Sequence, residues 1–302
     1  CSFTGNVVSG AGPGIGGGLL ASGATNEGVH IISNCEFMNN ESEFAGGGIG
    51  LGGGINTISN CSLTGNKSHV GGGISFEAVG STNTVSNCKI TGNNASNSHG
   101  GIYHSGGNVN LFGTIIVTDN TANGSKDNYC FASDDGFVTL SDDSGNKLST
   151  DSKIGVGTEK TPTASSSAQF ATGATEAMKK CFTPDNDSYY VSYKNDGELH
   201  LEVKVSDLYY KGGTFYTDSA CTSSTGMTKI SEAVKCLNST GKIHMLSQYA
   251  SSASETVDVP ANTNITVIRE SSFADASMFK ITGGTFTVNA EDPTSSITFD
   301  GQ

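Results

Sequence analysis

Cys1-Ser2-Phe3-Thr4-Gly5-Asn6 is the first of five copies of a hexapeptide with the form Cys-x-apolar-x-Gly/Asn-Asn. The other copies are Cys35-Glu36-Phe37-Met38-Asn39-Asn40, Cys61-Ser62-Leu63-Thr64-Gly65-Asn66, Cys88-Lys89-Ile90-Thr91-Gly92-Asn93 and Ile115-Ile116-Val117-Thr118-Asp119-Asn120, where Ile115 stands in the cysteine position. Their closing asparagines are 34, 26, 27 and 27 residues apart. A glycine-rich piece recurs between the copies, as Gly16-Gly17-Gly18-Leu19, Gly46-Gly47-Gly48-Ile49, Gly71-Gly72-Gly73-Ile74 and His99-Gly100-Gly101-Ile102. A fixed period of this length indicates a repeat architecture.

Each repeat carries short runs with the period of a β-strand. In residues 56–63 and 83–90 apolar or thiol side chains recur two or three positions apart, which we interpret as strands with one buried face. Gly, Asn and Ser interrupt every unit, and none holds a helical period of useful length, which excludes the helical solenoids. Strand–turn repeats of this length suit coils that each add one strand to every sheet. We therefore predict an all-β fold, a right-handed parallel β-helix (solenoid) with an irregular capping segment and one short capping helix.

Stacked coils place equivalent residues above one another at about 4.8 Å, so the repeats predict ladders. The expected apolar ladder is Phe3, Phe37, Leu63, Ile90 and Val117. The expected thiol ladder is Cys1, Cys35, Cys61 and Cys88. The expected asparagine ladder, which would hydrogen-bond the turns, is Asn6, Asn40, Asn66, Asn93 and Asn120. We also expect the glycine before the apolar residue of each glycine-rich piece to form a corner with φ > 0.

With these residues, the repeats resemble those of polymorphic outer-membrane proteins and related bacterial surface β-helix proteins. That group carries a Gly-Gly-x-Ile piece and a Phe-x-x-Asn piece, and Phe3-Thr4-Gly5-Asn6 and Phe37-Met38-Asn39-Asn40 match the second in full. Leu63, Ile90 and Val117 replace the aromatic residue in the later copies, and Gly replaces the usual Ala in the Gly-Gly piece. The resemblance covers residues 1–126. It implies a surface-displayed adhesin or structural stalk from the non-enzymatic branch of the pectate-lyase-like fold.

The composition is that of a turn-dense, acidic β protein. The 302 residues include 41 glycines, far above the usual share of about 7%, and carry a net charge of −13. The negative charge argues against nucleic acid or anionic lipid as partner. No apolar run approaches the 18 or more residues of a membrane span. We expect no nucleic-acid partner and no membrane span in this stretch of chain.

The chain divides by pattern into three segments, 1–126, 127–210 and 211–302. Residues 1–126 hold the repeat coils. Residues 127–210 lose the register and are expected to form closing coils and a cap, with a helical turn near residues 176–182. Within this cap, residues 189–193 and 198–203 predict a β-hairpin around the turn Asn195-Asp196-Gly197.

Residues 211–302 predict the helix-capped start of a second β-helix. Residues 228–237 are amphipathic, with Ile230, Ala233, Val234 and Leu237 on one face, and Thr228 or Ser231 is the expected N-cap. Strands are expected at residues 242–246, 255–259, 264–269, 278–281, 285–288 and 296–299. A helix over the open end of a coil stack protects an exposed sheet edge.

The sequence opens on Cys1 inside a repeat and stops in mid-pattern at Asp300-Gly301-Gln302. A lipidated N-terminal cysteine is one interpretation of Cys1, and a cut edge inside the ladder is the one we favour. We hypothesise that the chain is a slice or one period of a longer tandem array or fibre. The expected partners are then further units of the same kind, through self-association or tandem repetition.

The eight cysteines fall into two groups. The ladder cysteines are expected to be buried thiols that act as small apolar residues, with disulfides between neighbouring coils as the alternative. A ladder does not offer the tetrahedral geometry of a metal site. Outside the ladder, Cys130 with Cys181 and Cys221 with Cys236 are candidate disulfide pairs, which an extracellular setting would permit.

A carbohydrate-active enzyme, either a polysaccharide lyase or a glycoside hydrolase, is the main alternative, because parallel β-helices host both. Lyases of that kind need a carboxylate cluster for Ca²⁺ and a basic residue, yet the single arginine is Arg269. Hydrolases need two carboxylates about 5–9.5 Å apart. The candidates Asp134/Asp135 and Asp142/Asp143 stand in Gly/Ser turns, where acids ordinarily form the turn.

We therefore expect no catalytic, cofactor-binding or metal-binding residues. The predicted function is that of an extracellular or cell-surface structural or adhesive protein, with a glycan or a host-surface molecule as its ligand class. A passenger region of an autotransported protein is a third interpretation.

Overall fold

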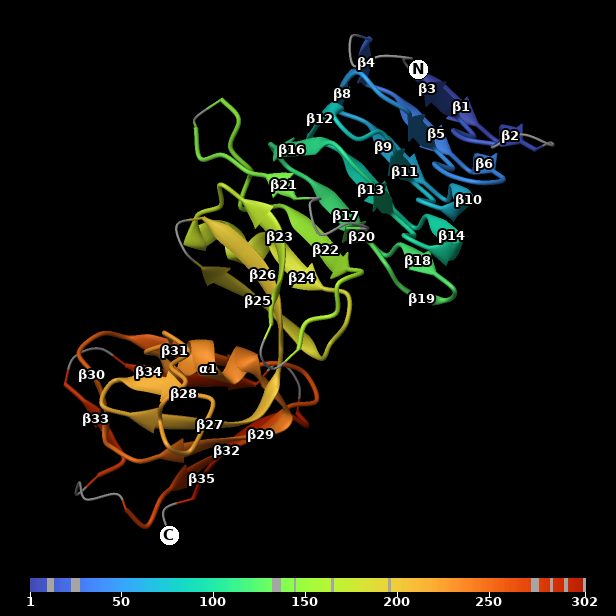
Figure 1. The fold of residues 1–302 in the computed structure, drawn as a ribbon. Helices are drawn as coiled ribbons and strands as arrows, with labels where there is room; N and C mark the ends of the chain where they lie inside the picture. The colour runs from blue at the N-terminus through green and yellow to red at the C-terminus, as the bar shows by residue number, and fades with distance from the viewer. Residues whose placement is uncertain are drawn as a thin grey trace. The chain divides into compact units, whose positions relative to one another are not determined.

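The computed structural model describes residues 1–9, 14–22, 28–131, 137–143, 145–163, 166–194, 197–272, 277–282, 285–290 and 293–300. The chain divides into two compact units, Cys1–Glu202 and Val203–Gln302. Short strands make up most of both units (Figure 1).

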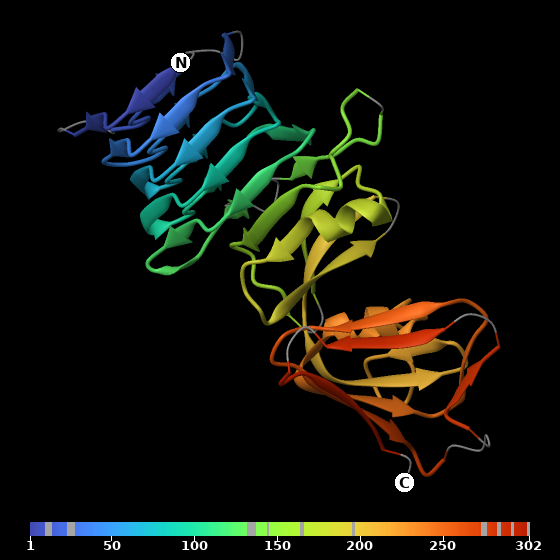
Figure 2. The ribbon, with the colours of Figure 1, turned by 180° about the vertical axis from the view of Figure 1, so that it is seen from behind.

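In the first unit each coil passes through four short strands, and equivalent strands of successive coils pair in parallel (Figures 1 and 2). The strands after the cysteine position are β1 (Ser2–Thr4), β5 (Glu36–Met38), β9 (Ser62–Thr64), β13 (Lys89–Thr91) and β17 (Ile116–Thr118). The strands after the ladder asparagine are β2 (Val7–Val8), β6 (Glu41–Ser42), β10 (Lys67–Val70), β14 (Asn94–Ser98) and β18 (Thr121–Ala122). The strand β19 (Ser125–Lys126) turns back antiparallel to β18.

The other two strands of each coil follow the glycine-rich piece. The third set is β3 (Leu19–Ala21), β7 (Ile49–Leu51), β11 (Ile74–Phe76), β15 (Ile102–His104) and β20 (Tyr129–Phe131). The fourth set is β4 (Val29–Ser33), β8 (Ile55–Ser59), β12 (Thr82–Ser86), β16 (Asn108–Phe112), β21 (Val138–Thr139) and β23 (Ala168–Thr172).

The register of these pairs follows the sequence repeat. Phe3 pairs with Phe37, Phe37 with Leu63, Leu63 with Ile90, and Ile90 with Val117, and the residues from Phe37 onward are fully buried. The Phe3 and Phe37 rings stack with centroids 4.7 Å apart, close to the spacing of paired strands. The predicted all-β parallel β-helix is confirmed.

The glycine-rich piece makes its corner two residues earlier than predicted. The first position of the piece has the positive φ, at 71° for Gly16, 63° for Gly46, 62° for Gly71 and 64° for His99, so the expectation for the glycine before the apolar residue is wrong. The second and third glycines are required for a different reason, because the backbone of a neighbouring coil lies too close to leave room for a Cβ. A Cβ on Gly72 would lie 2.5 Å from the carbonyl oxygens of Asn94 and Gly100.

The first unit ends in irregular strands. The long strand β22 (Lys153–Thr158) pairs through its first half with β17 and through its second half with β20. The closing elements are η1 (Glu176–Cys181), β24 (Phe182–Pro184), β25 (Tyr189–Lys194) and β26 (Glu198–Val203). β26 runs antiparallel to β23 and lies beside β25, at the positions expected for a hairpin. The turn residues Asn195 and Asp196 lie outside the described residues.

The second unit begins with β27 (Val205–Lys211), which pairs antiparallel with β28 (Thr214–Tyr216) and parallel with β29 (Leu237–Met245). The first part of β27 belongs to the predicted closing segment 127–210. The remaining strands are β30 (Tyr249–Ser251), β31 (Glu255–Val259), β32 (Asn264–Arg269), β33 (Phe279–Ile281), β34 (Phe286–Ala290) and β35 (Ser296–Asp300). The parallel pairs β29–β32–β35, β30–β33 and β31–β34 are again stacked coils.

The helix α1 (Ile230–Cys236) occupies the predicted amphipathic segment, and the four residues of its expected apolar face are buried. Neither Thr228 nor Ser231 caps it through a side chain, so that prediction is wrong: the N-cap position is Lys229. The side chain of Glu255 on β31 accepts a hydrogen bond from the Ser231 N–H at 2.7 Å instead. A carboxylate at a helix N-terminus fulfils the same role as a local cap.

Candidate functional site

All five predicted ladder asparagines stack inside the first unit, and Asn40, Asn66, Asn93 and Asn120 have no solvent exposure. The main-chain N–H and the Nδ2 of each residue donate to Oδ1 of the next, at 2.8–3.0 Å. The Nδ2 of Asn66 also donates back to the Phe37 carbonyl at 3.0 Å, and that of Asn93 to the Leu63 carbonyl at 3.0 Å. Each buried amide therefore joins its own coil to both neighbours.

The ladder extends beyond the sequence repeat. Asn120 donates through its main-chain N–H and its Nδ2 to Oδ1 of Asn128, both at 3.0 Å. Asn128 donates in the same way to the two carboxylate oxygens of Asp185, at 2.7 and 2.6 Å. Asn128 follows Asn120 by only eight residues, which is why the period of 26–27 residues did not indicate it.

The thiol ladder lies at the corner before the first strand of each coil. The Sγ atoms of Cys35, Cys61 and Cys88 donate to the carbonyls of the residues two positions earlier, at 3.1, 3.2 and 3.1 Å. Cys61 and Cys88 are buried, Cys35 is half-buried and Cys1 is exposed. The interaction of the Cys88 S–H with the Cys61 sulfur, together with burial, raises the pKa of the Cys88 thiol. The row lines an open groove of about 570 Å³ along the coils.

Neither predicted disulfide outside the ladder is formed in the structure: Cys130, Cys181 and Cys221 are all thiols. Cys130 and Cys181 pack against different segments. Cys181 donates to the Ser149 carbonyl at 3.5 Å, whereas Cys130 on β20 pairs with Gly157. The thiol of Cys236 donates to the Glu232 carbonyl at 3.3 Å.

A group made of the buried His99, the half-buried Asp127 and the exposed Glu159 lies beside the end of the ladder. The main-chain N–H of His99 donates to Asp127 Oδ2 at 2.8 Å, and His99 Nε2 lies 3.4 Å from Glu159 Oε1. Burial lowers the pKa of His99 to about 4, so its ring is neutral at pH 7. Burial, and then the charges of Asp185 and Glu159, raise the pKa of Asp127 to about 6, against the hydrogen bond from His99.

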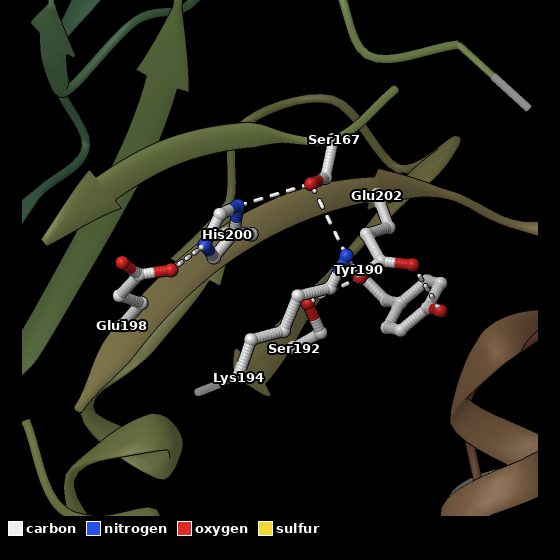
Figure 3. Close-up of polar contacts among 7 residues, drawn as sticks. All are labelled: Ser167, Tyr190, Ser192, Lys194, Glu198, His200 and Glu202. Carbon is white, nitrogen blue, oxygen red and sulfur yellow. Dashed lines mark hydrogen bonds and ion pairs between the residues drawn. The ribbon is translucent and has the colours of Figure 1, made fainter. Parts of the chain in front are cut away.

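A second polar group, which the sequence analysis missed, lies on the closing strands (Figure 3). On β25 the apolar Tyr189, Val191 and Tyr193 pack against the core, so the alternate residues Tyr190, Ser192 and Lys194 take the other face. On β26 Leu199 and Leu201 are buried in the core. The alternation of Glu198, His200 and Glu202 with these leucines is the pattern in the sequence that could have indicated a polar group on the other face of β26.

The side chains of Lys194, Ser167, His200 and Glu198 form a continuous chain of contacts. Ser167 Oγ lies 3.0 Å from His200 Nδ1, and His200 Nε2 lies 3.0 Å from Glu198 Oε2. Lys194 Nζ donates to Ser167 Oγ at 3.2 Å (Figure 3). His200 is 9% exposed and Ser167 is half-buried, so the imidazole is held in place while the hydroxyl keeps access to solvent.

Glu202 holds the lysine of this chain. Its carboxylate pairs with Lys194 Nζ at 2.8 Å and accepts from Ser192 at 2.6 Å and Tyr190 at 2.9 Å. Burial raises the pKa of Glu202, but these three hydrogen bonds outweigh it and leave the pKa below its usual value. Glu202 is therefore charged at neutral pH and fixes the ammonium group beside Ser167.

Ser167 and His200 line a cavity of about 210 Å³. Phe131 and Phe137 form its apolar wall, and Lys160 and Gln169 are among its polar residues. Gln169 pairs with His200 across β23 and β26. The arrangement therefore combines a hydroxyl, an oriented imidazole and nitrogen donors around one small hollow.

The carboxylate pairs considered for glycoside hydrolysis do not form such a site. Asp134 and Asp135 lie outside the described residues. Asp142 and Asp143 are exposed, and Asp143 N–H bonds to Ser141 Oγ at 3.1 Å in a local turn. Within the described ranges, no three His, Cys, Asp or Glu residues are arranged to hold a metal ion. Those ranges also contain no helix that is long and apolar enough to cross a membrane.

Comparison with known proteins supports the architecture. Residues 1–150 match the family model described as right handed beta helix region. No curated protein and no solved structure matches the chain. Together with the parallel register of successive coils, the family match shows an all-β right-handed parallel β-helix.

Proposed function

We propose that this chain is an extracellular or cell-surface protein with a structural or adhesive role, akin to polymorphic outer-membrane proteins, whose stacked coils act as a stiff spacer. The observation that carries the proposal is the buried ladder from Asn6 to Asp185. A coil that is hydrogen-bonded to both neighbours through a buried amide cannot tilt or slide without breaking those bonds. Such a stack resists bending, which is the property a stalk needs.

A tandem array is the arrangement we propose for these units, because the chain holds two sets of parallel coils, one in each compact unit. The groove along the thiol row offers a regular surface for a glycan or a host-surface molecule. We propose that the coils themselves are not catalytic. Among the described residues that line this groove, Glu36 is the sole carboxylate, whereas glycoside hydrolysis needs two.

The location is tested by labelling intact cells that produce the protein with an antibody raised against residues 1–202. The expected result is strong labelling before permeabilisation and no large increase after it. A signal that appears only after permeabilisation would contradict the surface location. Digestion of intact cells with an added protease, followed by detection of the released fragments, provides the control for antibody access.

A further inference from the structure

The hydrogen-bond chain at Ser167 fixes where its protons lie. Glu198 has only acceptor oxygens when charged, so His200 Nε2 carries the hydrogen of their 3.0 Å contact. In the neutral ring, Nδ1 is then an acceptor, and Ser167 Oγ–H donates to it at 3.0 Å. A hydroxyl that donates to an imidazole, which is in turn oriented by a carboxylate, is the arrangement of an activated nucleophile.

The surroundings stabilise the charge that an attacking oxygen would develop. Lys194 Nζ donates to Ser167 Oγ at 3.2 Å, so a positive charge faces the oxygen from which the proton leaves. Glu202 holds this ammonium group through its 2.8 Å ion pair. Gln169 and Lys160 also line the cavity that Ser167 lines, and their side chains carry donors of the type that stabilises an oxyanion.

The size and the lining of the cavity limit the kind of substrate group that can lie next to Ser167. A volume of about 210 Å³ is smaller than the roughly 300–1,000 Å³ of sites for drug-sized ligands. Phe131 and Phe137 line it beside the polar Thr158, Lys160 and Gln169, so a short acyl group would meet two aromatic rings as well as polar side chains. An acetyl or similar acyl group next to Ser167 Oγ fits these limits.

We propose that Ser167 is the nucleophile of a hydrolytic site for esters of short acyl groups, with His200 as general base and Glu198 as the residue that positions His200. Ser167 Oγ bonds to the ester carbonyl carbon while its proton passes to His200 Nδ1. The carbon–oxygen bond to the alcohol breaks, and the alcohol leaves with that proton. Water then attacks the acyl-serine, giving its proton to His200 and on to Ser167 Oγ as the carboxylic acid is released. This activity would be additional to the structural role.

The test treats the full 302-residue chain with a fluorophosphonate, which bonds to an activated serine with loss of fluoride, and locates the adduct by peptide mass spectrometry. The expected result is an adduct on Ser167 in the folded protein and none after denaturation. In parallel, hydrolysis of p-nitrophenyl acetate should fall at least about 100-fold in Ser167→Ala and in His200→Gln, because general-base catalysis contributes about 10²–10⁴-fold. Glu198→Gln should lower kcat and shift the pH at which kcat falls, because the carboxylate no longer acts on the imidazole of His200, whereas a smaller folded fraction would lower kcat without moving that pH.

Ser188→Ala is the matched control, since Ser188 is an exposed serine just before β25 and its main-chain N–H, which alanine keeps, bonds to Asn186 Oδ1 at 2.9 Å. It should keep hydrolysis within about twofold of the unmodified chain, given that surface substitutions rarely matter. Absence of an adduct on Ser167 would overturn the proposal, and this measurement needs no variant to fold. Equal hydrolysis by Ser167→Ala and the unmodified chain would overturn it as well, and the cluster would then only tie β23 to β25 and β26.

Discussion

Asp185 ends the buried ladder by accepting both donors of Asn128, the main-chain N–H at 2.7 Å and the side-chain Nδ2 at 2.6 Å. Every earlier member is an asparagine, and each one from Asn40 to Asn128 accepts from one neighbour and donates to the other. An asparagine at the last position would need a further acceptor for the hydrogens of its own amide. A charged carboxylate only accepts, so it leaves no donor without a partner. Burial raises the pKa of Asp185 although the two bonds from Asn128 oppose it.

Replacing a central rung should weaken the first unit strongly. Asn93→Ala removes the acceptor of two hydrogen bonds from Asn66, and it removes the Nδ2 that donates to Leu63, Thr91 and Asn120, at a site with no solvent exposure. We expect the free energy of unfolding to fall by about 3 kcal/mol or more, because each buried group left without a partner costs about 1–3 kcal/mol. Urea unfolding of the full chain measures this.

The control for this rung is Asn97→Ala, in which an exposed asparagine of the same coil is truncated. It should change the free energy of unfolding by no more than about 0.5 kcal/mol. Similar losses in both variants would mean that the ladder bonds add nothing specific.

The glycine-rich piece should not tolerate a methyl group at its second position. In Gly72→Ala the new Cβ would lie 2.5 Å from two backbone carbonyl oxygens of neighbouring strands, and backbone cannot move aside as a flexible side chain can. We expect a loss of about 2–4 kcal/mol in the free energy of unfolding. Gly145→Ala, where a Cβ would meet nothing within 4 Å, should be nearly neutral. A well-folded Gly72→Ala protein with unchanged stability would contradict the observed spacing of the coils.

Asp127 should make stability depend on pH in a defined direction. Its pKa is raised from 3.8 to about 6 in the folded chain, so the charged form is disfavoured by folding. The stability cost of Asp127 is absent below about pH 4, grows as the pH rises through 6 and is complete above it. Asp127→Asn should therefore raise the free energy of unfolding by about 1–3 kcal/mol at pH 8 and change it little at pH 4.

Comparing Asp127→Asn with the unmodified chain at each pH cancels the separate effect of His99. His99 acts in the opposite direction. Its folded pKa of about 4 lies below its usual value, so its contribution lowers the free energy of unfolding as the pH falls. An equal effect of the substitution at pH 4 and pH 8 would show that Asp127 does not titrate as its burial requires.

The cysteines should differ in their rate of alkylation according to their access to solvent. Iodoacetamide added to the folded chain should modify Cys1 and Cys221 first, whereas Cys88 and Cys130 should react only after denaturation, because burial raises their pKa and the thiolate is the reactive form. Mass spectrometry with and without prior reduction checks both statements. A mass increase that appears at Cys130 and Cys181 only after reduction would show that these two cysteines are disulfide-bonded.

The repeat positions were readable from the sequence because identical coils impose one register. Phe37, Leu63 and Ile90 recur at one place in the motif, and stacking turns that recurrence into a ladder. The corner was misplaced because all three glycines of Gly71-Gly72-Gly73 look alike in sequence, while only the first has φ > 0. The other two are needed because neighbouring backbones approach closely, and that approach depends on the stacking of coils.

Neither the end of the asparagine ladder at Asp185 nor the polar group around Ser167 could be derived from the period of the sequence repeat. Asp185 follows Asn128 by 57 residues, and Ser167 precedes His200 by 33, so each contact depends on how irregular strands return to the stack. The hairpin strands were expected, but that Glu198 and His200 share one face of the second strand was not drawn from them. Nothing in the sequence indicated that β23 would bring Ser167 to that face.

Electron microscopy of native material from the producing cells tests whether these coils build a stiff structural element. If they do, straight rods with a regular axial repeat are expected, much longer than the few coils of one chain at about 4.8 Å per coil. Isolated particles no larger than a single chain, under conditions that preserve native surface material, would contradict it.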